Sequence, residues 1–270
     1  MVAVMKNTEL SDSEFMLFRN MIYEIAGINL TIIKKPLVSG RLSKRLKHYG
    51  VESFHEYFKL IKSNVNGELQ TAIDLLTTNE TFFFREPKHF DFLRDAVLPL
   101  HGNSSLRAWS AASSSGEEAY TLAMMLAEYA RTSNWEIVGT DISTRVLARA
   151  REAHYSLERT DGMPQHMLHK YCLKGVGSQE GTFIVCRELQ ERVSFVHANL
   201  KSDLSKLGSF DVIFLRNVLI YFDLETKQQV VSRIIRQLKP GGYLFVSHSE
   251  SLNGVTNDVT VVKPSIYRKP

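Results

Sequence analysis

The apolar residues in the first third of the chain recur at helical spacing, without strand-like alternation. Phe15, Phe18 and Ile22 lie three or four residues apart, and Ser11 with Glu14 forms the pattern of a capping box before them. The same spacing returns in three further stretches, over 36–49, 54–61 and 69–76. We therefore expect a small all-helical domain over residues 1–78.

Beyond residue 95 the pattern changes, because short apolar runs of strand length alternate with longer amphipathic runs. Strands are expected within 106–110, 135–140, 193–197, 211–215, 243–248 and 259–267. This alternation predicts an α/β domain in which helices cover both faces of a mostly parallel sheet. Between residues 171 and 192 the alternation lapses and glycines separate short β-like pieces, which we interpret as a small β insertion.

The first predicted strand runs into a loop of small residues that ends at Gly116 and is followed by Glu117 and Glu118. In open α/β sheets, ligands bind beyond the carboxyl ends of the strands. A dinucleotide requires several glycines there, so that its pyrophosphate can approach backbone N–H groups. This loop has one glycine, and its acidic pair would repel a phosphate. The pattern favours a cationic ligand that carries no phosphate.

S-adenosylmethionine fits this description, because it carries a sulfonium and an ammonium group and has no phosphate. Asp141 ends the second strand at the spacing from the loop at which a carboxylate reaches ribose hydroxyls. Asn199 and Leu200 follow the third strand and could contact the adenine. Asn217 and Val218 follow the fourth strand. Taken together, the four strand ends predict an S-adenosylmethionine site.

Charge and cysteine content narrow the choice of partners. The net charge of +4 is too small to demand nucleic acid. Cys172 and Cys186 show neither a disulfide framework nor a metal-site spacing, so we expect no metal and a reducing compartment. The chain shows neither a signal peptide nor an apolar run of membrane-spanning length. We therefore expect a cytoplasmic protein that does not insert directly into a membrane.

A local basic patch lies in the second predicted helix. Arg41, Lys44 and Arg45 fall on one face of it, and no Asp or Glu occurs between Glu24 and Glu52. One interpretation is a solvated face. The other is a docking surface for an acidic partner.

The connector at 79–94 is unusually rich in specific polar groups. Asn79, Thr81 and Arg85 flank three consecutive phenylalanines. Three aromatic residues beside an obligate cation favour a lid over a ligand. An ordinary hinge with buried phenylalanines is the alternative interpretation.

Five segments of the chain resemble the chemotaxis receptor methyltransferase (CheR) family. They keep the order and spacing of that family, and NETFFFRE and RNVLIYF are motifs that general methyltransferases do not share. The segments are TTNETFFFREPKHF, RAWSAASSSGEEAYTLAM, GTDISTRVLARA, FDVIFLRNVLIYFD and LKPGGYLFVSHSE. The resemblance implies a Rossmann-like S-adenosylmethionine-dependent methyltransferase domain over 95–270, including the insertion. The connector would contact the cofactor.

The resemblance also implies an activity and roles for individual residues. The activity is methylation of glutamate side chains on chemoreceptor signalling helices, which gives glutamate methyl esters and S-adenosylhomocysteine. Arg85 and Tyr221 would flank the transferred methyl group and are the candidate catalytic residues. The implied cofactor contacts are Asn79, Thr81, Arg85, Glu118, Asp141, Asn199, Leu200, Asn217 and Val218.

Two contacts with the receptor follow from the same resemblance. Arg41, Lys44 and Arg45 would dock the acidic methylation helices. The loop at 175–181 resembles the loop through which some relatives hold a pentapeptide at the receptor C-terminus.

Two rival functions remain open. A nucleic-acid methyltransferase would use the basic patch to hold phosphates, but it predicts a Pro-Pro-aromatic motif after the fourth strand, where this chain has Arg216, Asn217 and Val218. A regulator that binds S-adenosylmethionine without turnover is the second rival. The presence of Arg85 and Tyr221 argues against it.

Overall fold

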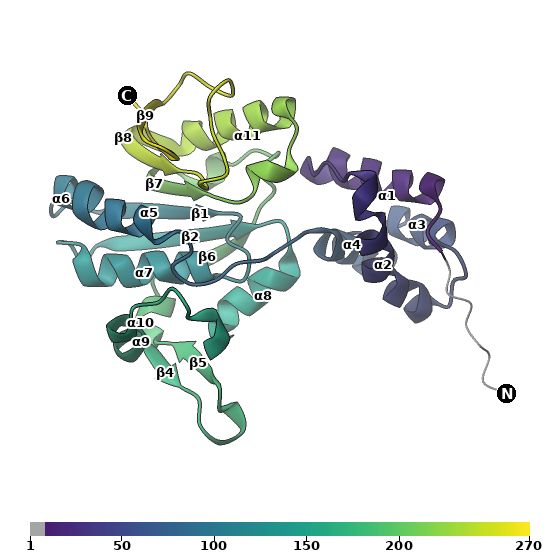
Figure 1. Ribbon diagram of the computed structural model, residues 1–270, viewed down its shortest axis with the longest axis horizontal. Coiled ribbons are helices and arrows are strands. Elements are labelled where there is room, and N and C mark those ends of the chain that lie inside the picture. The colour runs from purple at the N-terminus through teal and green to yellow at the C-terminus, as the bar shows by residue number, and fades with distance from the viewer. Residues whose placement is uncertain (1–8) are drawn as a thin grey trace. The chain divides into compact units, whose positions relative to one another are not determined.

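The computed structural model describes residues 9–270 of the chain (Figure 1). The chain divides into two compact units. The helical unit comprises residues up to Thr78 together with Tyr221–Asp223, and the larger unit comprises Asn79–Ile220 and Leu224–Pro270. No helix within residues 9–270 is at once long and apolar enough to cross a membrane.

The helical unit packs short helices around aromatic side chains. Phe18 contacts the ring of Tyr57, with 6.2 Å between their centroids, and that of Phe58, at 5.3 Å. The expected capping box is present, because Ser11 and Glu14 bond each other's backbone N–H groups. The helices are α1 (Asp12–Ala26), η1 (Ile32–Lys34), α2 (Lys35–Tyr49), α3 (Phe54–Lys62), η2 (Val65–Gly67) and α4 (Glu68–Leu76).

The larger unit is built on a seven-stranded sheet with the order β6-β2-β1-β7-β8-β10-β9. Its first five strands run parallel, which confirms the predicted α/β class. The final predicted strand is instead two short strands, and β10 pairs antiparallel with both β8 and β9. The strands are β1 (Leu106–Ala111), β2 (Trp135–Asp141), β6 (Val193–His197), β7 (Phe210–Leu215), β8 (Leu238–Phe245), β9 (Thr260–Lys263) and β10 (Ile266–Arg268).

Helices cover the sheet, and Figure 1 shows α7 beside β1 and β2 and α11 beside β7 and β8. The core between them contains Phe90, Phe214 and Phe245, all of which are buried. Phe90 stacks on Phe214, which stacks on Phe245. The helices are α5 (Pro87–Phe92), the π-helical turn η3 (Leu93–Val97), α6 (Leu98–His101), α7 (Glu117–Tyr129), α8 (Thr144–Glu152) and α11 (Leu224–Gln237), and short turns η6 (Ser205–Leu207) and η7 (Leu219–Tyr221) connect strands.

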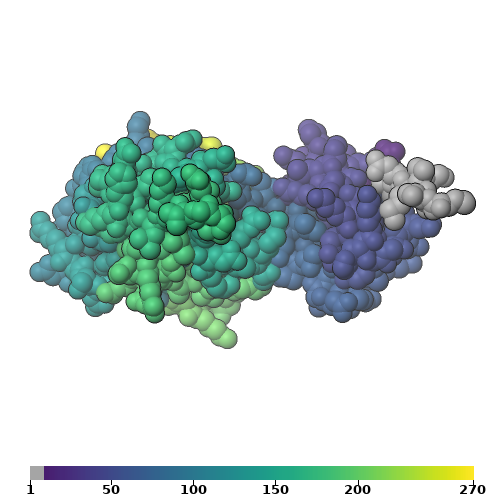
Figure 2. Space-filling model, turned by 90° about the horizontal axis from the view of Figure 1, so that it is seen from below, coloured from purple at the N-terminus to yellow at the C-terminus, as the bar shows by residue number. Residues whose placement is uncertain are grey.

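The β insertion is larger than the sequence predicts. It begins at residue 154 rather than 171, because a three-residue strand, β3 (His154–Ser156), pairs with β5 (Thr182–Val185). β4 (Cys172–Lys174) pairs with the other edge of β5. Figure 2 shows the green atoms of this region on the face turned to the viewer. The remaining elements are η4 (Leu157–Arg159), α9 (Gln165–Tyr171), η5 (Gly177–Gln179) and α10 (Arg187–Gln190).

Candidate functional site

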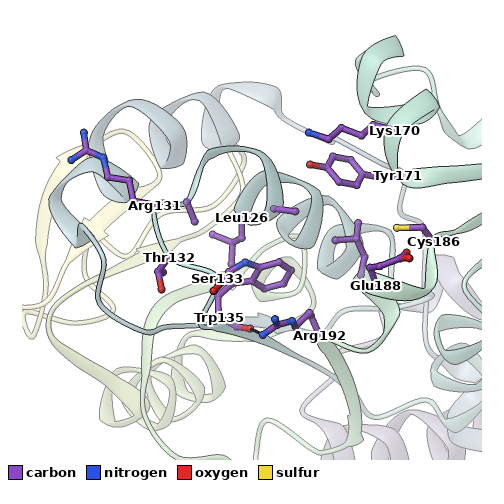
Figure 3. Close-up of a pocket in the computed structure, with 13 residues that line it drawn as sticks. Leu126, Arg131, Thr132, Ser133, Trp135, Lys170, Tyr171, Cys186, Glu188 and Arg192 are labelled. Atoms are coloured by element: carbon purple, nitrogen blue, oxygen red, sulfur yellow. Dashed lines mark hydrogen bonds between the residues drawn. The ribbon is translucent and has the colours of Figure 1, made fainter.

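A cavity of about 580 Å³ opens at the amino-terminal edge of the sheet (Figure 3). Trp135, the first residue of β2, lies in its wall, whereas Asp141 ends the same strand at the opposite edge. Arg192 lies 5.6 Å from the centre of the Trp135 ring, and Lys170 is ion-paired with Glu128 at 2.7 Å. Ligands of open α/β sheets bind at the other edge, so this cavity is not the predicted site.

The loop after β1 turns sharply at the carboxyl edge of the sheet. Ser114 and Gly116 both have positive φ, 51° and 96°. A Cβ at Gly116 would lie 2.9 Å from the Cβ of Ala150 and 2.9 Å from the hydroxyl of Tyr155. Both the space and the φ therefore require glycine here. The loop thus returns directly into α7 and stays close to the strand ends.

Asp141 holds the ends of β2 and its neighbouring loops together. Its carboxylate accepts hydrogen bonds from the backbone N–H groups of Ser114 and Ser143, both at 2.9 Å. Its carbonyl accepts one from Ala198 at 3.0 Å, which brings the 199–200 segment to the same edge. Asp141 is buried. The structure therefore places three of the predicted strand-end features together, and ribose binding by Asp141 stays a prediction.

The two glutamates at the start of α7 have different surroundings. Glu117 is fully buried and pairs with Arg159 at 2.6 Å. Burial raises its pKa, although bonds from Ser115 and Arg159 oppose this. Glu118 keeps 14% of its side chain exposed and accepts a hydrogen bond from Ser110 at 2.7 Å. Burial also raises the pKa of Glu118, against the nearby positive charge of Arg216. Of these two glutamates, Glu118 is the one whose carboxylate keeps access to solvent.

Arg216 is a buried cation at this edge of the sheet that the sequence pattern does not single out. Its side chain is 2% exposed, and its guanidinium lies 5.6 Å from the ring centre of Phe90 and 5.7 Å from that of Phe214. It forms ion pairs with Glu86 of the connector and with Glu118 of α7, each at 3.1 Å. It also donates a hydrogen bond to the carbonyl of Arg85. The only signal in the sequence is a basic residue directly after an apolar strand. Arg216 joins the connector to α7 and β7.

The connector is tied to the first loop through its backbone. The carbonyl of Asn79 accepts a hydrogen bond from the Ser114 hydroxyl at 2.8 Å. The carbonyl of Thr81 accepts one from Arg159 at 3.0 Å. Asn79 and Thr81 therefore belong to a segment that lies along the loop after β1. Their contacts with the cofactor stay predictions.

Arg85 is held by its own neighbours in the connector. Its guanidinium lies 5.6 Å from the ring centre of Phe82 and donates to the carbonyl of Glu80 at 3.0 Å. Phe82 is 44% exposed, whereas the next two phenylalanines are buried. A guanidinium has five N–H donors, so the Glu80 bond leaves others for a carboxylate. The arrangement presents an oriented cation beside an exposed aromatic ring.

Asn217 follows β7 in a left-handed conformation with a φ of 56°. Its backbone N–H donates to the Glu250 carboxylate at 3.0 Å, and its side-chain amide donates to Ser247 at 2.8 Å. Val218 is partly exposed, and Leu200 is buried. Asn217 is therefore fixed by the loop after β8. The roles of Asn199 and Leu200 toward adenine, and of Asn217 and Val218 at the floor of the cofactor site, stay predictions.

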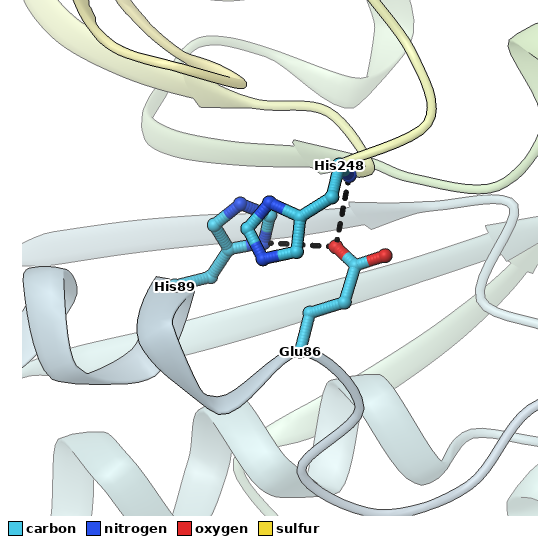
Figure 4. Close-up of side chains that lie close together, drawn as sticks. All are labelled: Glu86, His89 and His248. Carbon is cyan, nitrogen blue, oxygen red and sulfur yellow. Dashed lines mark hydrogen bonds and ion pairs between the residues drawn. The ribbon is translucent and has the colours of Figure 1, made fainter.

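Glu86, His89 and His248 form a cluster whose possible ligand atoms lie within 4.8 Å of one another (Figure 4). Burial, with the charge of Arg216, lowers the pKa of His89 to about 3, so its imidazole is neutral. The hydroxyl of Ser265 lies 2.7 Å from His89 and 3.2 Å from His248. Arg216 lies 3.1 Å from Glu86, so its positive charge would oppose a further cation at that carboxylate. The cluster fits a polar joint between α5 and the end of β8 better than a metal site.

The candidate catalytic pair is divided between the two units. Arg85 belongs to the larger unit and Tyr221 to the helical unit. The carbonyl of Tyr221 accepts a hydrogen bond from Asn29 at 2.9 Å, and Asp223 accepts one from Tyr23 at 2.6 Å. Their joint action on a methyl group stays a prediction.

Two of the three predicted docking residues are engaged within the helical unit. Arg45 makes two bonds, of 2.8 and 2.6 Å, to Glu68, which is 1% exposed. Arg41 donates to two backbone carbonyls at the end of α4, at 3.1 and 2.9 Å. Lys44 is exposed and makes no ion pair within residues 9–270. Of the three, Lys44 alone keeps an uncommitted charge in the described chain.

Comparison with known proteins assigns both units. The family described as "CheR methyltransferase, all-alpha domain" matches residues 13–77, and "CheR methyltransferase, SAM binding domain" matches residues 79–268. A chemotaxis protein methyltransferase of Escherichia coli K12 is 40% identical over 96% of this chain and 91% of its own length. One from Borreliella burgdorferi is 38% identical over 97% of this chain and 96% of its own. Chemotaxis protein methyltransferase 2 of Pseudomonas aeruginosa is 40% identical over 94% of this chain and 92% of its own length.

Proposed function

The chain belongs to the CheR family of S-adenosylmethionine-dependent chemotaxis methyltransferases, and from this premise we propose that its acceptors are glutamate side chains of chemoreceptor signalling helices. The products are glutamate methyl esters and S-adenosylhomocysteine. One observation carries the proposal. Arg216 of the RNVLIYF motif contacts Glu86 and the Arg85 carbonyl of the NETFFFRE motif, beside Glu118. The two family-specific motifs thus meet at the edge of the sheet where the strand ends predict the cofactor.

The residues at this edge fit S-adenosylmethionine. Glu118 uses one oxygen for Ser110 and the other for Arg216, so further lone pairs remain for an ammonium group. Asp141 lies at the end of β2, where a carboxylate reaches ribose hydroxyls. The loop between β1 and α7 offers a single glycine, followed by an acidic pair, which suits a ligand without phosphate. When bound, S-adenosylmethionine supplies an electrophilic methyl group on a good leaving group.

The chain's task is then to position an acceptor rather than to activate it. A glutamate side chain has an ordinary pKa near 4.3 and is ionised at pH 7, so it needs no general base. Holding reactants in line can supply up to about 7–11 kcal/mol of the barrier. We assign Arg85 the steering of a carboxylate, through the N–H groups that Glu80 does not use. We assign Tyr221 the orientation of the reacting groups through its hydroxyl.

A methyl-transfer assay separates this proposal from its rivals. The purified protein is titrated with S-adenosylmethionine and then given a chemoreceptor cytoplasmic fragment, or nucleic acid, with a methyl-labelled donor. The proposal predicts label on the receptor that is released by mild base. Base-stable label on nucleic acid would instead support a nucleic-acid methyltransferase. Binding without any transfer would support a regulator.

A chemoreceptor substrate also implies a cellular compartment for the protein and a second contact with the receptor. Receptor signalling helices lie in the cytoplasm, so the protein acts there, without inserting into the membrane. The 175–181 loop joins β4 to β5 and exposes 79% of Val176, which suits contact with a receptor C-terminal pentapeptide. Removing that pentapeptide from a receptor that carries it should raise KM, and an unchanged KM would reject the contact.

A further inference from the structure

The connector is held in an unusual backbone conformation. Phe84 and Glu86 both have positive φ, of 54° and 59°. For a large side chain such as phenylalanine this conformation is rare, because the Cβ atom crowds the backbone. A residue stays in such a conformation only where the surrounding contacts enforce it. The shape of the connector therefore depends on the elements packed around it.

Arg159 of the β insertion makes three contacts that hold the beginning of the connector. Its Nη1 atom donates to the carbonyl of Thr81 at 3.0 Å and to the carboxylate of Glu117 at 2.6 Å. Its own carbonyl accepts a hydrogen bond from the backbone N–H of Phe83 at 3.3 Å. Arg216 holds the other end of the connector, also by a bond to a backbone carbonyl. One arginine thus holds each end of this segment.

The position of the Arg159 side chain is fixed by its bonds, since 39% of it is exposed. Its partner Glu117 is fully buried and accepts a further hydrogen bond from the Ser115 hydroxyl at 2.7 Å. Tyr155, four residues before Arg159, donates to the Ser115 carbonyl at 2.7 Å, and its ring lies 5.0 Å from that of Phe83. A charge-assisted bond to so constrained a carboxylate orients the guanidinium.

Stability alone does not explain why this position carries an arginine. An ion pair is weak evidence for stability, because apolar side chains of similar volume often stabilise a buried position as well. A guanidinium differs from an apolar side chain in its several N–H donors, and here one nitrogen bonds Glu117 and Thr81 together. The buried carboxylate fixes the cation, and the cation fixes the carbonyl of the connector.

We propose that Arg159 is a positioning residue for methyl transfer, which holds Thr81 where it contacts S-adenosylmethionine. The inference rests on the proposed function in that it takes the predicted Thr81 contact as given. Arg159 acts through Thr81 and not on the cofactor itself. The acidic pair of α7 then has two separate tasks, because Glu117 anchors Arg159 at the beginning of the connector and Glu118 anchors Arg216 at its end.

Titration calorimetry with S-adenosylmethionine tests this and needs no methyl acceptor. Arg159→Met alone would leave the buried Glu117 carboxylate unpaired, so the comparison is between Glu117→Gln and the double variant E117Q/R159M, both measured well below their Tm. Glutamine keeps an oxygen for Arg159, and Glu117→Gln should bind the cofactor within about threefold of the wild type. The double variant also loses the bond to the Thr81 carbonyl, and its Kd should be about tenfold higher than that of Glu117→Gln.

Lys239→Met is the matched control. Lys239 is 37% exposed and pairs with Asp211 at 2.8 Å in the same unit. The two residues lie at the starts of β8 and β7, at the edge of the sheet opposite to the predicted cofactor site. Removing this ion pair should leave the Kd for S-adenosylmethionine within about twofold of the wild-type value.

The outcomes separate Arg159 from the choice of methyl acceptor. A purely structural role would lower the Tm of the double variant without changing its Kd, and that result would overturn the inference. An equal rise of Kd in Lys239→Met would overturn it too. If the wild-type protein binds S-adenosylmethionine but transfers no methyl to receptor glutamates, the proposed function fails, while the comparison of Kd values still decides the role of Arg159.

Discussion

Replacing Arg216 by methionine tests whether this side chain holds the candidate site together. Arg216 is the shared cation of two carboxylates, those of Glu86 and Glu118, each 3.1 Å away. Methionine keeps much of the apolar contact with the rings of Phe90 and Phe214, so the change mainly removes charge and hydrogen bonds.

The expected loss of stability is large because two carboxylates are left without a partner. Removing one member of a buried ion pair typically costs about 3–5 kcal/mol. Glu86 and Glu118 keep 16% and 14% of their side chains exposed, so we take the lower end, about 3 kcal/mol. In a unit of this size that corresponds to a fall in Tm of roughly 6–12 °C. Because the connector loses its anchor, affinity for S-adenosylmethionine should also fall.

The loss of stability in R216M should depend on pH. The sign of that dependence follows from the pKa values of the carboxyl groups of Glu86 and Glu118. In the wild-type protein, burial acts to raise the pKa of Glu86, but the charge of Arg216 with other bonds holds it below its ordinary value. That stabilisation is present above about pH 4.5 and is lost as the pH falls through the folded pKa. Without Arg216 the buried carboxyls favour their protonated form. The penalty of R216M should therefore be smaller at pH 5 than at pH 8.

Urea denaturation followed by circular dichroism at both pH values measures this. The double variant E86Q/R216M removes one of the two carboxylates that R216M leaves unpaired. It should recover about 1–2 kcal/mol of the free energy of unfolding at pH 8. A loss under about 1 kcal/mol, or an equal loss at pH 5 and pH 8, would refute the assignment of Arg216 as the shared cation.

Three further changes test other contacts. Replacing Arg45 by methionine removes a cation that lowers the pKa of Glu68, so acid unfolding, followed by circular dichroism, should begin at higher pH than in the wild type. Replacing Phe82 by alanine removes the ring beside Arg85 and should lower kcat for receptor methylation roughly tenfold, measured at saturating S-adenosylmethionine. Replacing Gly116 by alanine should cost about 1–3 kcal/mol in urea denaturation, and a neutral result would contradict the crowding at that position.

Much of the architecture is predictable because it depends on local patterns. Helical spacing, capping residues and strand length are read from neighbouring residues, and the fold class follows correctly from them. The family follows from the resemblance of motifs such as NETFFFRE and RNVLIYF. The errors involve very short elements. β3 has three residues and β10 has three, too few for any alternation to be visible. The insertion therefore begins earlier than predicted. The last predicted strand is in fact two strands, β9 and β10.

The contacts of individual charged side chains are not predictable in this way. Arg216 bonds to groups 98 and 131 residues away, and Arg45 bonds to Glu68 across 23 residues. Helical periodicity places Arg45 on the same face as Arg41 and Lys44, but the partner that neutralises it lies on another helix. Sequence shows which charges exist, and the fold decides which of them remain available to a partner.

The most direct test of the proposed activity is mass spectrometry of a receptor cytoplasmic fragment after incubation with the protein and S-adenosylmethionine. The account predicts a mass increase of one methylene on glutamate residues, reversed by mild alkali, and absent at sites where glutamate is replaced by alanine. A modification that survives alkali, or that lies on any residue other than glutamate, would contradict glutamate esterification as the function of this chain.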